Sequence, residues 1–473
     1  MRFKATIVLS LLLLILGGYL YYIEIPSDRK KQEAEIQQKR LYSFTPASIT
    51  NLTIKNANGE TIEFLHDPDH PEDPWRITRP VETIANDAAA SMLASQLERL
   101  EAGRVVEEKP EALKEFGLDP PVYSVIVTLN RVDTEILEVG SENLTGSEVY
   151  VRKGAGTPVY LVPAAIKKSL NKDLRGWRQQ EVLHFASTDV KRVQIESPRQ
   201  QIEIAREGEG WQIKKPIQTK ADPTEVSNLL GSLSSLRGEE FIDDRKAERM
   251  KAFGPPILKV RLGVAEVERE ARFYRLSSEP ETVYAVTTPF APIYKFSAQT
   301  LKAIEEPAAT YRDKRVVDLS GPVSVEQISI RKKGGALLLE KKEGSWSIQG
   351  TPAKKVSDPE KVNGLLSELA DLRVARFIDA PPPTAAKVGL TDPEWSIQLK
   401  GKEGKLLGEV ALGRAEGSAL YAQSYNQPGP FLVNKEDTER LRQAAESIKA
   451  AEAAPPPPAA APAPKQEKNQ PPG

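Results

Sequence analysis

A tryptophan-containing stretch of the chain occurs three times at nearly constant spacing. The sequence WRITRP begins at Trp75, WQIKKP at Trp211 and WSIQGTP at Trp346, so the tryptophans lie 136 and 135 residues apart. Solenoid repeats are about 20–50 residues long. The much longer spacing here indicates tandem duplication of a domain-sized unit.

The segment after each tryptophan is repeated as well. Eleven or twelve residues downstream, a leucine-rich segment with helical spacing begins at a predicted N-cap, which is Asn86, Asp222 or Asp358. The side-chain oxygen of such a residue accepts a hydrogen bond from a free backbone N–H of the first turn. The apolar positions of the second and third segments correspond one to one and predict a helix with one buried face. They are Val226, Leu229, Leu230, Leu233 and Leu236, and Val362, Leu365, Leu366, Leu369 and Leu372.

Each predicted helix leads to a short apolar segment that ends in an acidic residue. Glu107, Asp243 and Asp379 each lie 21 residues beyond their N-cap. They could act as general acid–base groups or cap the short helix that follows. Three equivalent acids in three separate copies do not form a pair within one site, so capping is the favoured interpretation.

A glycine turn and alternating strands complete each copy. The turns EFGLDPP, AFGPP and KVGLTDP each predict the end of a short helix at a glycine, which is Gly117, Gly254 or Gly389. Strands such as YSVIVTL, ILKVRLG and WSIQLKG follow. Because the connections are mostly short, we expect largely antiparallel sheets and an α+β class. The predicted modules are residues 42–182, 183–316 and 317–450.

The N-terminal end predicts a membrane anchor. Residues 5–23 carry no charge and would rise about 28 Å as a helix, which matches the hydrocarbon core of a bilayer. A cleaved signal peptide is the alternative. The basic residues on the two sides of the span nearly balance, and a short basic N-terminus favours the cytoplasmic side. We therefore expect residues 1–27 to form a cytoplasmic tip and transmembrane anchor, residues 28–41 a charged stalk, and the remainder to lie outside the cytoplasm.

The C-terminal residues 451–473 are rich in proline and alanine and predict a disordered tail. The rest of the chain has an ordinary composition, and its net charge of −1 does not favour nucleic-acid binding. The chain contains no cysteine, which excludes disulfides and thiol chemistry.

Candidate chemistry is sparse. The loop HDPDHPEDP, residues 66–74, clusters His66 and His70 with four acids and could hold a metal, but its prolines and charges favour a solvated connection. A third histidine, His184, shares no position with the other two. We find no phosphate-binding loop, zinc-protease motif or nucleophile elbow, so we expect no catalytic residue, no metal and no cofactor.

The stretch at Trp75 allows two interpretations. Trp75 could stack on a ligand while Arg76 and Arg79 hold an anion, or the stretch could be a strand that buries Trp75 and Ile77. In the three copies the tryptophan, the isoleucine and the proline persist, whereas the arginines do not. Because the varying positions are those expected on a solvent face, a buried strand is favoured.

The order of these motifs resembles the bacterial domain of unknown function 4340, over residues 42–450. The second copy lacks the leucine of FGL, and the first lacks the proline after its N-cap. The resemblance implies tandem copies behind a membrane anchor, often beside gliding-motility-type ABC transporter components, and it carries over no catalytic residue.

These observations together predict a non-enzymatic scaffold or interaction protein. It would be a single-pass protein of the inner membrane, attached by residues 5–23, with its N-terminus inside and its bulk in the periplasm. We expect it to be an accessory of an ABC-type transport or envelope assembly system. The alternatives are an extracytoplasmic module that binds envelope polysaccharide, peptide or lipid, and an undetected hydrolase.

Overall fold

A computed structural model describes residues 39–70, 74–108, 110–244, 246–287, 291–319, 324–350, 354–356, 358–378 and 382–449. The predicted membrane span, nearly all of the predicted stalk and the predicted tail lie outside the described residues. In the described part of the chain, no helix combines the length and the apolar character that crossing a membrane requires. The chain divides into two compact units, Met1–Glu203 with Ser227–Glu306, and Ile204–Val226 with Pro307–Gly473.

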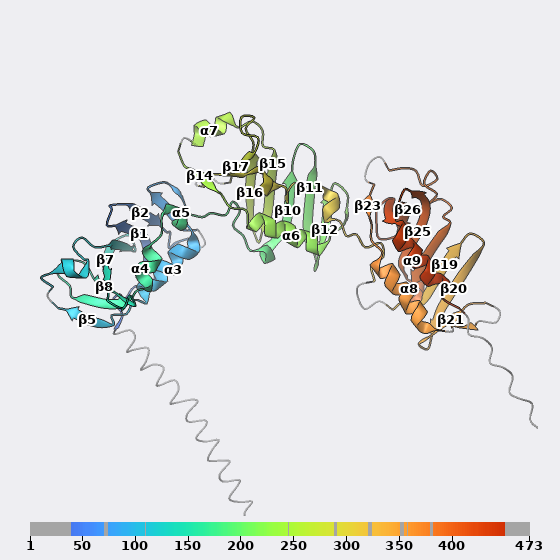
Figure 1. The fold of residues 1–473 in the computed structure, drawn as a ribbon, viewed down its shortest axis with the longest axis horizontal. Coiled ribbons are helices and arrows are strands. Elements are labelled where there is room, and N and C mark those ends of the chain that lie inside the picture. The colour runs from blue at the N-terminus through green and yellow to red at the C-terminus, as the bar shows by residue number, and fades with distance from the viewer. Residues whose placement is uncertain are drawn as a thin grey trace, which may run out of the picture. The chain divides into compact units, whose positions relative to one another are not determined.

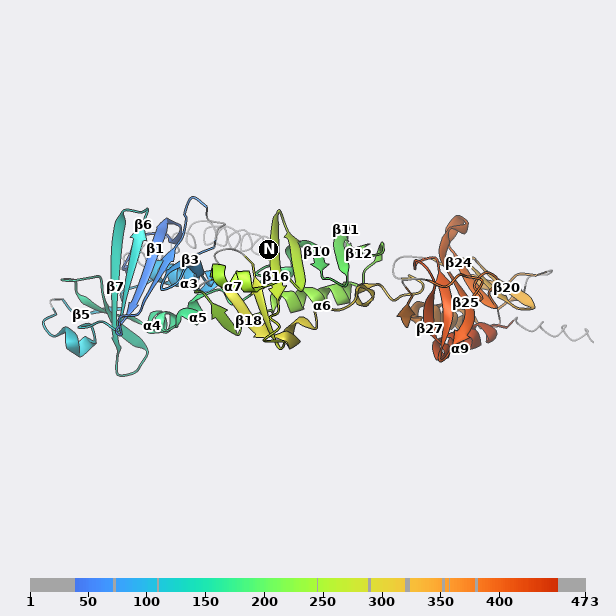
Figure 2. The same cartoon turned by 90° about the horizontal axis from the view of Figure 1, so that it is seen from above.

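The described residues form three sheets of nine strands each, and all three sheets have the same strand order. The first is β4-β3-β2-β1-β6-β7-β8-β9-β5, the second β13-β12-β11-β10-β15-β16-β17-β18-β14, and the third β22-β21-β20-β19-β24-β25-β26-β27-β23. The strand pairs are antiparallel, for example β1 with β6 and β24 with β25. The α+β class with three tandem modules is therefore confirmed. Figure 2 shows β1, β6 and β7 of the first sheet side by side.

The strands of the first sheet are β1 (Ile49–Asn56), β2 (Thr61–Leu65), β3 (Arg76–Arg79), β4 (Thr83–Ile84), β5 (Arg104–Glu107), β6 (Tyr123–Leu129), β7 (Asp133–Glu142), β8 (Glu148–Arg152) and β9 (Val159–Pro163). Those of the second are β10 (Val190–Glu196), β11 (Gln201–Glu207), β12 (Gly210–Lys215), β13 (Thr219–Lys220), β14 (Glu240–Ile242), β15 (Leu258–Val264), β16 (Val267–Tyr274), β17 (Thr282–Val286) and β18 (Ile293–Ser297). Those of the third are β19 (Gln327–Lys332), β20 (Gly335–Lys342), β21 (Ser345–Ile348), β22 (Lys354–Lys355), β23 (Arg376–Phe377), β24 (Trp395–Lys400), β25 (Leu406–Glu416), β26 (Ala419–Ser424) and β27 (Phe431–Asn434).

One long helix follows the first four strands of each module. These helices are α3 (Asp87–Glu98), α6 (Pro223–Ser234) and α8 (Pro359–Asp371), and each carries the chain from one edge strand of its sheet to the strand at the opposite edge. The other α-helices of the described residues are α4 (Ala165–Leu170), α5 (Leu174–Trp177), α7 (Lys246–Ala252) and α9 (Lys435–Glu446). In the third module α8 packs against α9 (Figure 1).

The long helices begin at the predicted N-caps. Asn86 accepts a hydrogen bond from the backbone N–H of Ala89 at 3.1 Å, and Asp358 accepts one from Glu360 at 3.0 Å. Asp222 accepts from Thr224 at 2.9 Å. The predicted apolar faces are buried: in α8, Val362, Leu365 and Leu369 have no exposed side-chain surface, while Leu366 is half-buried.

The three repeated tryptophans lie in the cores of their modules. Trp75 is 3% exposed, Trp211 7% and Trp346 5%. The His66 ring stacks on Trp75 with 4.7 Å between centroids, and Ile77 is fully buried. Arg79, by contrast, is 72% exposed in its side chain and reaches Glu63 at 3.4 Å. This arrangement is the one that the strand interpretation of WRITRP predicts.

The three repeated glycines do not share one backbone role. Gly117 and Gly389 have positive φ values of 65° and 75°, whereas Gly254 does not have positive φ. A Cβ at Gly117 would overlap Ser141 Oγ and lie 2.9 Å from the Ser141 nitrogen, and one at Gly254 would meet nothing within 4 Å. Glycine is therefore structurally required in the first and third turns but not in the second.

Replacing Gly117 by alanine is expected to destabilise the first module by about 1–3 kcal/mol from backbone strain alone, with the Ser141 overlap adding to this loss. Replacing Gly254 by alanine is the matched control and should leave stability unchanged or slightly raised. Hydrogen exchange of β6 and β7 in the full chain, compared with β15 and β16, measures both effects. Equal losses in the two variants would contradict the prediction.

Candidate functional site

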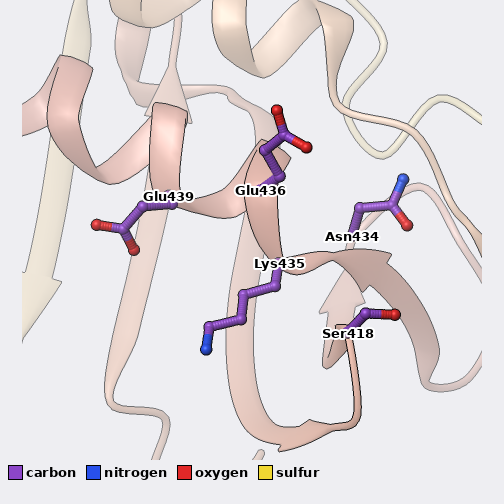
Figure 3. Close-up of a pocket in the computed structure, with 5 residues that line it drawn as sticks. All are labelled: Ser418, Asn434, Lys435, Glu436 and Glu439. Carbon is purple, nitrogen blue, oxygen red and sulfur yellow. The ribbon is translucent and has the colours of Figure 1, made fainter.

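An open surface depression of about 510 Å³ lies at the start of α9. Its lining residues are Ser418, Asn434, Lys435, Glu436 and Glu439, and their side chains point in different directions (Figure 3). Asn434 donates to Asp437 Oδ2 at 3.2 Å, and Glu436 reaches Arg440 at 3.5 Å. Because these groups do not converge on a common point, the depression does not have the geometry of a catalytic site.

The histidine loop is held by contacts within the first module. His66 Nδ1 lies 3.3 Å from the Ile49 carbonyl oxygen, and Arg131 donates to Asp67 at 3.1 Å and to Asp69 at 3.2 Å. Glu72 and Asp73 lie outside the described residues. Within the described ranges, no group of three or more His, Cys, Asp or Glu residues could hold a metal ion. His184 is exposed in a different module.

The capping interpretation of the repeated acids was wrong for the two acids that the structure describes. The short 3-10 helix after Glu107 spans Leu113–Phe116, and its N-cap is Ala112. The Asp243 carboxylate instead accepts a hydrogen bond from Arg178 Nη2 at 2.9 Å. A hydrogen bond from a buried guanidinium stabilises a carboxylate more than one from a neutral amide. Because Arg178 belongs to the preceding module, the local sequence around Asp243 does not predict this contact. Asp379 lies outside the described residues.

Arg178 and Asp243 belong to a largely buried charged cluster of the first unit. We call it the first joint cluster and define it as Arg178, Glu181, Phe241, Asp243 and Tyr294. The Arg178 side chain is only 4% exposed and that of Asp243 is 19% exposed. The guanidinium carbon lies 4.8 Å from the centre of the Phe241 ring, and Tyr294 meets the same ring edge-on at 5.9 Å. The cation is therefore paired with both an anion and an aromatic face.

The pKa values in and beside this cluster follow from burial. Burial raises the pKa of the Tyr294 phenol above its ordinary value, and the nearby Glu181 carboxylate adds to the rise. The Lys246 ammonium donates to the Ala291 carbonyl oxygen at 2.8 Å, and burial lowers the pKa of Lys246. The phenol thus stays neutral near pH 7, and the Asp243 carboxylate is engaged by Arg178. This chemistry suits the attachment of one chain segment to another better than proton transfer to a substrate.

The sequence carries a signal for this cluster in a repeated pair of residues outside the motifs named above. An aromatic–arginine pair occurs at the end of the first module, Trp177–Arg178, and again at the end of the second, Tyr311–Arg312. Arg312 is 3% exposed, and its guanidinium carbon lies 3.6 Å from the centre of the Phe377 ring. Phe377 and Phe241 lie in equivalent edge strands, β23 and β14.

Comparison with known protein families gives a match over most of the chain. The family described as Domain of unknown function (DUF4340) matches residues 75–255, 211–383 and 351–453. The first two segments begin near a repeated tryptophan and extend into the following module, so the matched unit is longer than one sheet. No curated protein matches the chain.

Two solved structures of a Pseudomonas aeruginosa DNA polymerase sliding clamp align weakly with the chain. The clamp with ligand is 7% identical over 84% of this chain and 94% of that chain, with a TM-score of 0.14. The griselimycin-bound clamp is 8% identical over the same shares, with a TM-score of 0.13. Scores this low carry no argument about fold or function. On the strength of the three tandem matches, the chain belongs to the family described as Domain of unknown function (DUF4340).

Proposed function

We propose that the protein is a non-enzymatic scaffold that presents three copies of one module to partner proteins. The single observation that carries this proposal is that a largely buried charged cluster, Arg178 with Asp243 and Tyr294, joins the first module to the second. An enzyme would direct such groups into a cleft that a substrate can enter. The same strand order in all three sheets supports a repeated interaction platform.

The proposal includes a location and a class of partner. Residues 5–23 would anchor the chain in the inner membrane, with residues 1–4 in the cytoplasm and the modules outside it. The motif order and the tandem layout support an accessory role in an ABC-type transport or envelope assembly system. An extracytoplasmic ligand-binding role would require a repeated aromatic cleft, and the three repeated tryptophans are buried instead.

Membrane sidedness can be tested directly because the chain contains no cysteine. Leu144, in the β7–β8 turn, is fully exposed, so a Leu144→Cys variant of the full chain offers one reactive thiol. We expect a membrane-impermeant maleimide to label it in cells with a permeabilised outer membrane and an intact inner membrane. Labelling only after the inner membrane is lysed would place the modules in the cytoplasm and overturn the proposed location. The cysteine-free parent chain is the control for background labelling.

The partner class can be tested by site-specific crosslinking in intact cells. A photoreactive residue is placed in the full chain at Leu144, Val267 or Tyr425, which are exposed positions in the three modules. We expect at least one position to capture ABC transporter subunits or envelope assembly proteins. The matched control is a fusion of residues 1–41 to an unrelated periplasmic domain. Recovery of the same proteins in the same amounts from that control would contradict the scaffold proposal.

A further inference from the structure

The segment at the end of the first module is hydrogen-bonded both to the rest of that module and to the second module. Towards the first module, the Asn86 N–H donates to the Trp177 carbonyl at 2.7 Å, and Gln179 donates to Ile84 at 3.0 Å. Towards the second, Gly238 donates to the Gln180 carbonyl at 3.0 Å. Gln179 and Gln180 are adjacent, so no free linker residue separates the two attachments.

The segment at the end of the second module repeats this pattern. The Asp222 N–H donates to the Tyr311 carbonyl at 2.9 Å, and Asp313 donates to Lys220 at 3.0 Å. On the other side, the Val374 N–H donates to the Lys314 carbonyl at 2.8 Å. In both segments, therefore, one residue is hydrogen-bonded to the earlier module and the very next residue is hydrogen-bonded to the later one.

One arginine side chain crosses each of these attachments. Arg178 forms a backbone bridge with Ala85 of the first module, while its guanidinium binds Asp243 and covers Phe241 of the second. Arg312 forms the same backbone bridge with Ala221, and its guanidinium covers Phe377. A buried guanidinium is always charged and presents a planar face, so it tolerates few alternative positions.

We infer that Arg178 is a clasp residue that fixes the first module against the second. Modules joined by a flexible linker move independently by default. The two-sided backbone attachment and the buried arginine remove that freedom, so a displacement of one module would be passed to its neighbour. This inference goes beyond the proposed function and holds whichever partner the modules bind.

The test measures the distance between two spin labels on the full chain. The absence of native cysteine allows Leu144→Cys and Val267→Cys to be labelled specifically, and both native side chains are exposed. We expect one narrow distance distribution between the first and second modules. Arg178→Ala should broaden it about twofold, because inter-domain motion is the default once the interface contacts are lost. A parent distribution that is already broad would overturn the inference.

Matched variants separate the clasp from general damage. Arg192 pairs with Glu268 at 2.9 Å on the surface of the second module, so Arg192→Ala removes an arginine ion pair without touching the first joint cluster and should leave the distribution narrow. Arg178→Lys keeps the charge but loses the planar fork, and we expect intermediate broadening. If Arg178→Ala does not fold by circular dichroism, Phe241→Leu replaces it. An unchanged width in folded Arg178→Ala or Phe241→Leu would refute the clasp.

Discussion

Replacing Trp75 by alanine is expected to lower the free energy of unfolding of the first module by about 3–5 kcal/mol, the cost of truncating a large buried aromatic. The side chain is 3% exposed and lies against the His66 ring. Truncation removes these contacts and leaves a cavity, because the close-packed surroundings relax only partly. Hydrogen exchange of β1 and β2 in the full chain measures the loss of stability within this module. A global unfolding curve would instead combine the transitions of three modules.

Arg79→Ala is the control within the same stretch. Its side chain is 72% exposed and pairs with Glu63 at 3.4 Å, and an exposed pair of this kind contributes about 0–1 kcal/mol. If Trp75 and Arg79 instead formed a ligand site, both variants should lose little stability. Unchanged exchange in Trp75→Ala would therefore refute the strand interpretation.

Leu365→Ala in α8 is expected to destabilise the third module by about 2–5 kcal/mol. Leu365 is fully buried and lies in the core cluster that also contains Val362 and Leu369. The truncation removes buried apolar surface on the face that joins the helix to its sheet. Hydrogen exchange of α8 and α9 should accelerate, because the two helices pack together.

Ser367→Ala tests the opposite face of the same helix. Ser367 is exposed, and alanine has a higher helix propensity than serine, so stability should stay the same or rise by a few tenths of a kcal/mol. Equal losses in Ser367→Ala and Leu365→Ala would mean that the apolar face of α8 does not determine how the helix packs.

Local patterns predicted most of the secondary structure. The stretch YSVIVTL forms β6 with the predicted bounds, and WSIQLKG forms β24 except for its last residue. These elements follow from residue spacing and from short-range hydrogen bonds, which depend on a few neighbouring residues. The role of Asp243 was mispredicted, because its partner Arg178 lies 65 residues away in the sequence.

The first joint cluster is another feature that the local sequence does not predict. The pairs Trp177–Arg178 and Tyr311–Arg312 are visible in the sequence, but an arginine after an aromatic residue does not indicate burial. Strand β14 of the next module and the residue after it bring Phe241 and Asp243 to Arg178. The groups that stabilise the buried Arg178 guanidinium lie 63 and 65 residues away in the chain.

The sequence by itself determined that the protein repeats one α+β module three times, because repetition and hydrophobic periodicity are properties of the order of residues. The tertiary structure decided the strand order of the sheets and the burial of the arginines between successive modules. The physical reason is that a buried charge is stable only beside its partners, and the fold alone brings those partners together.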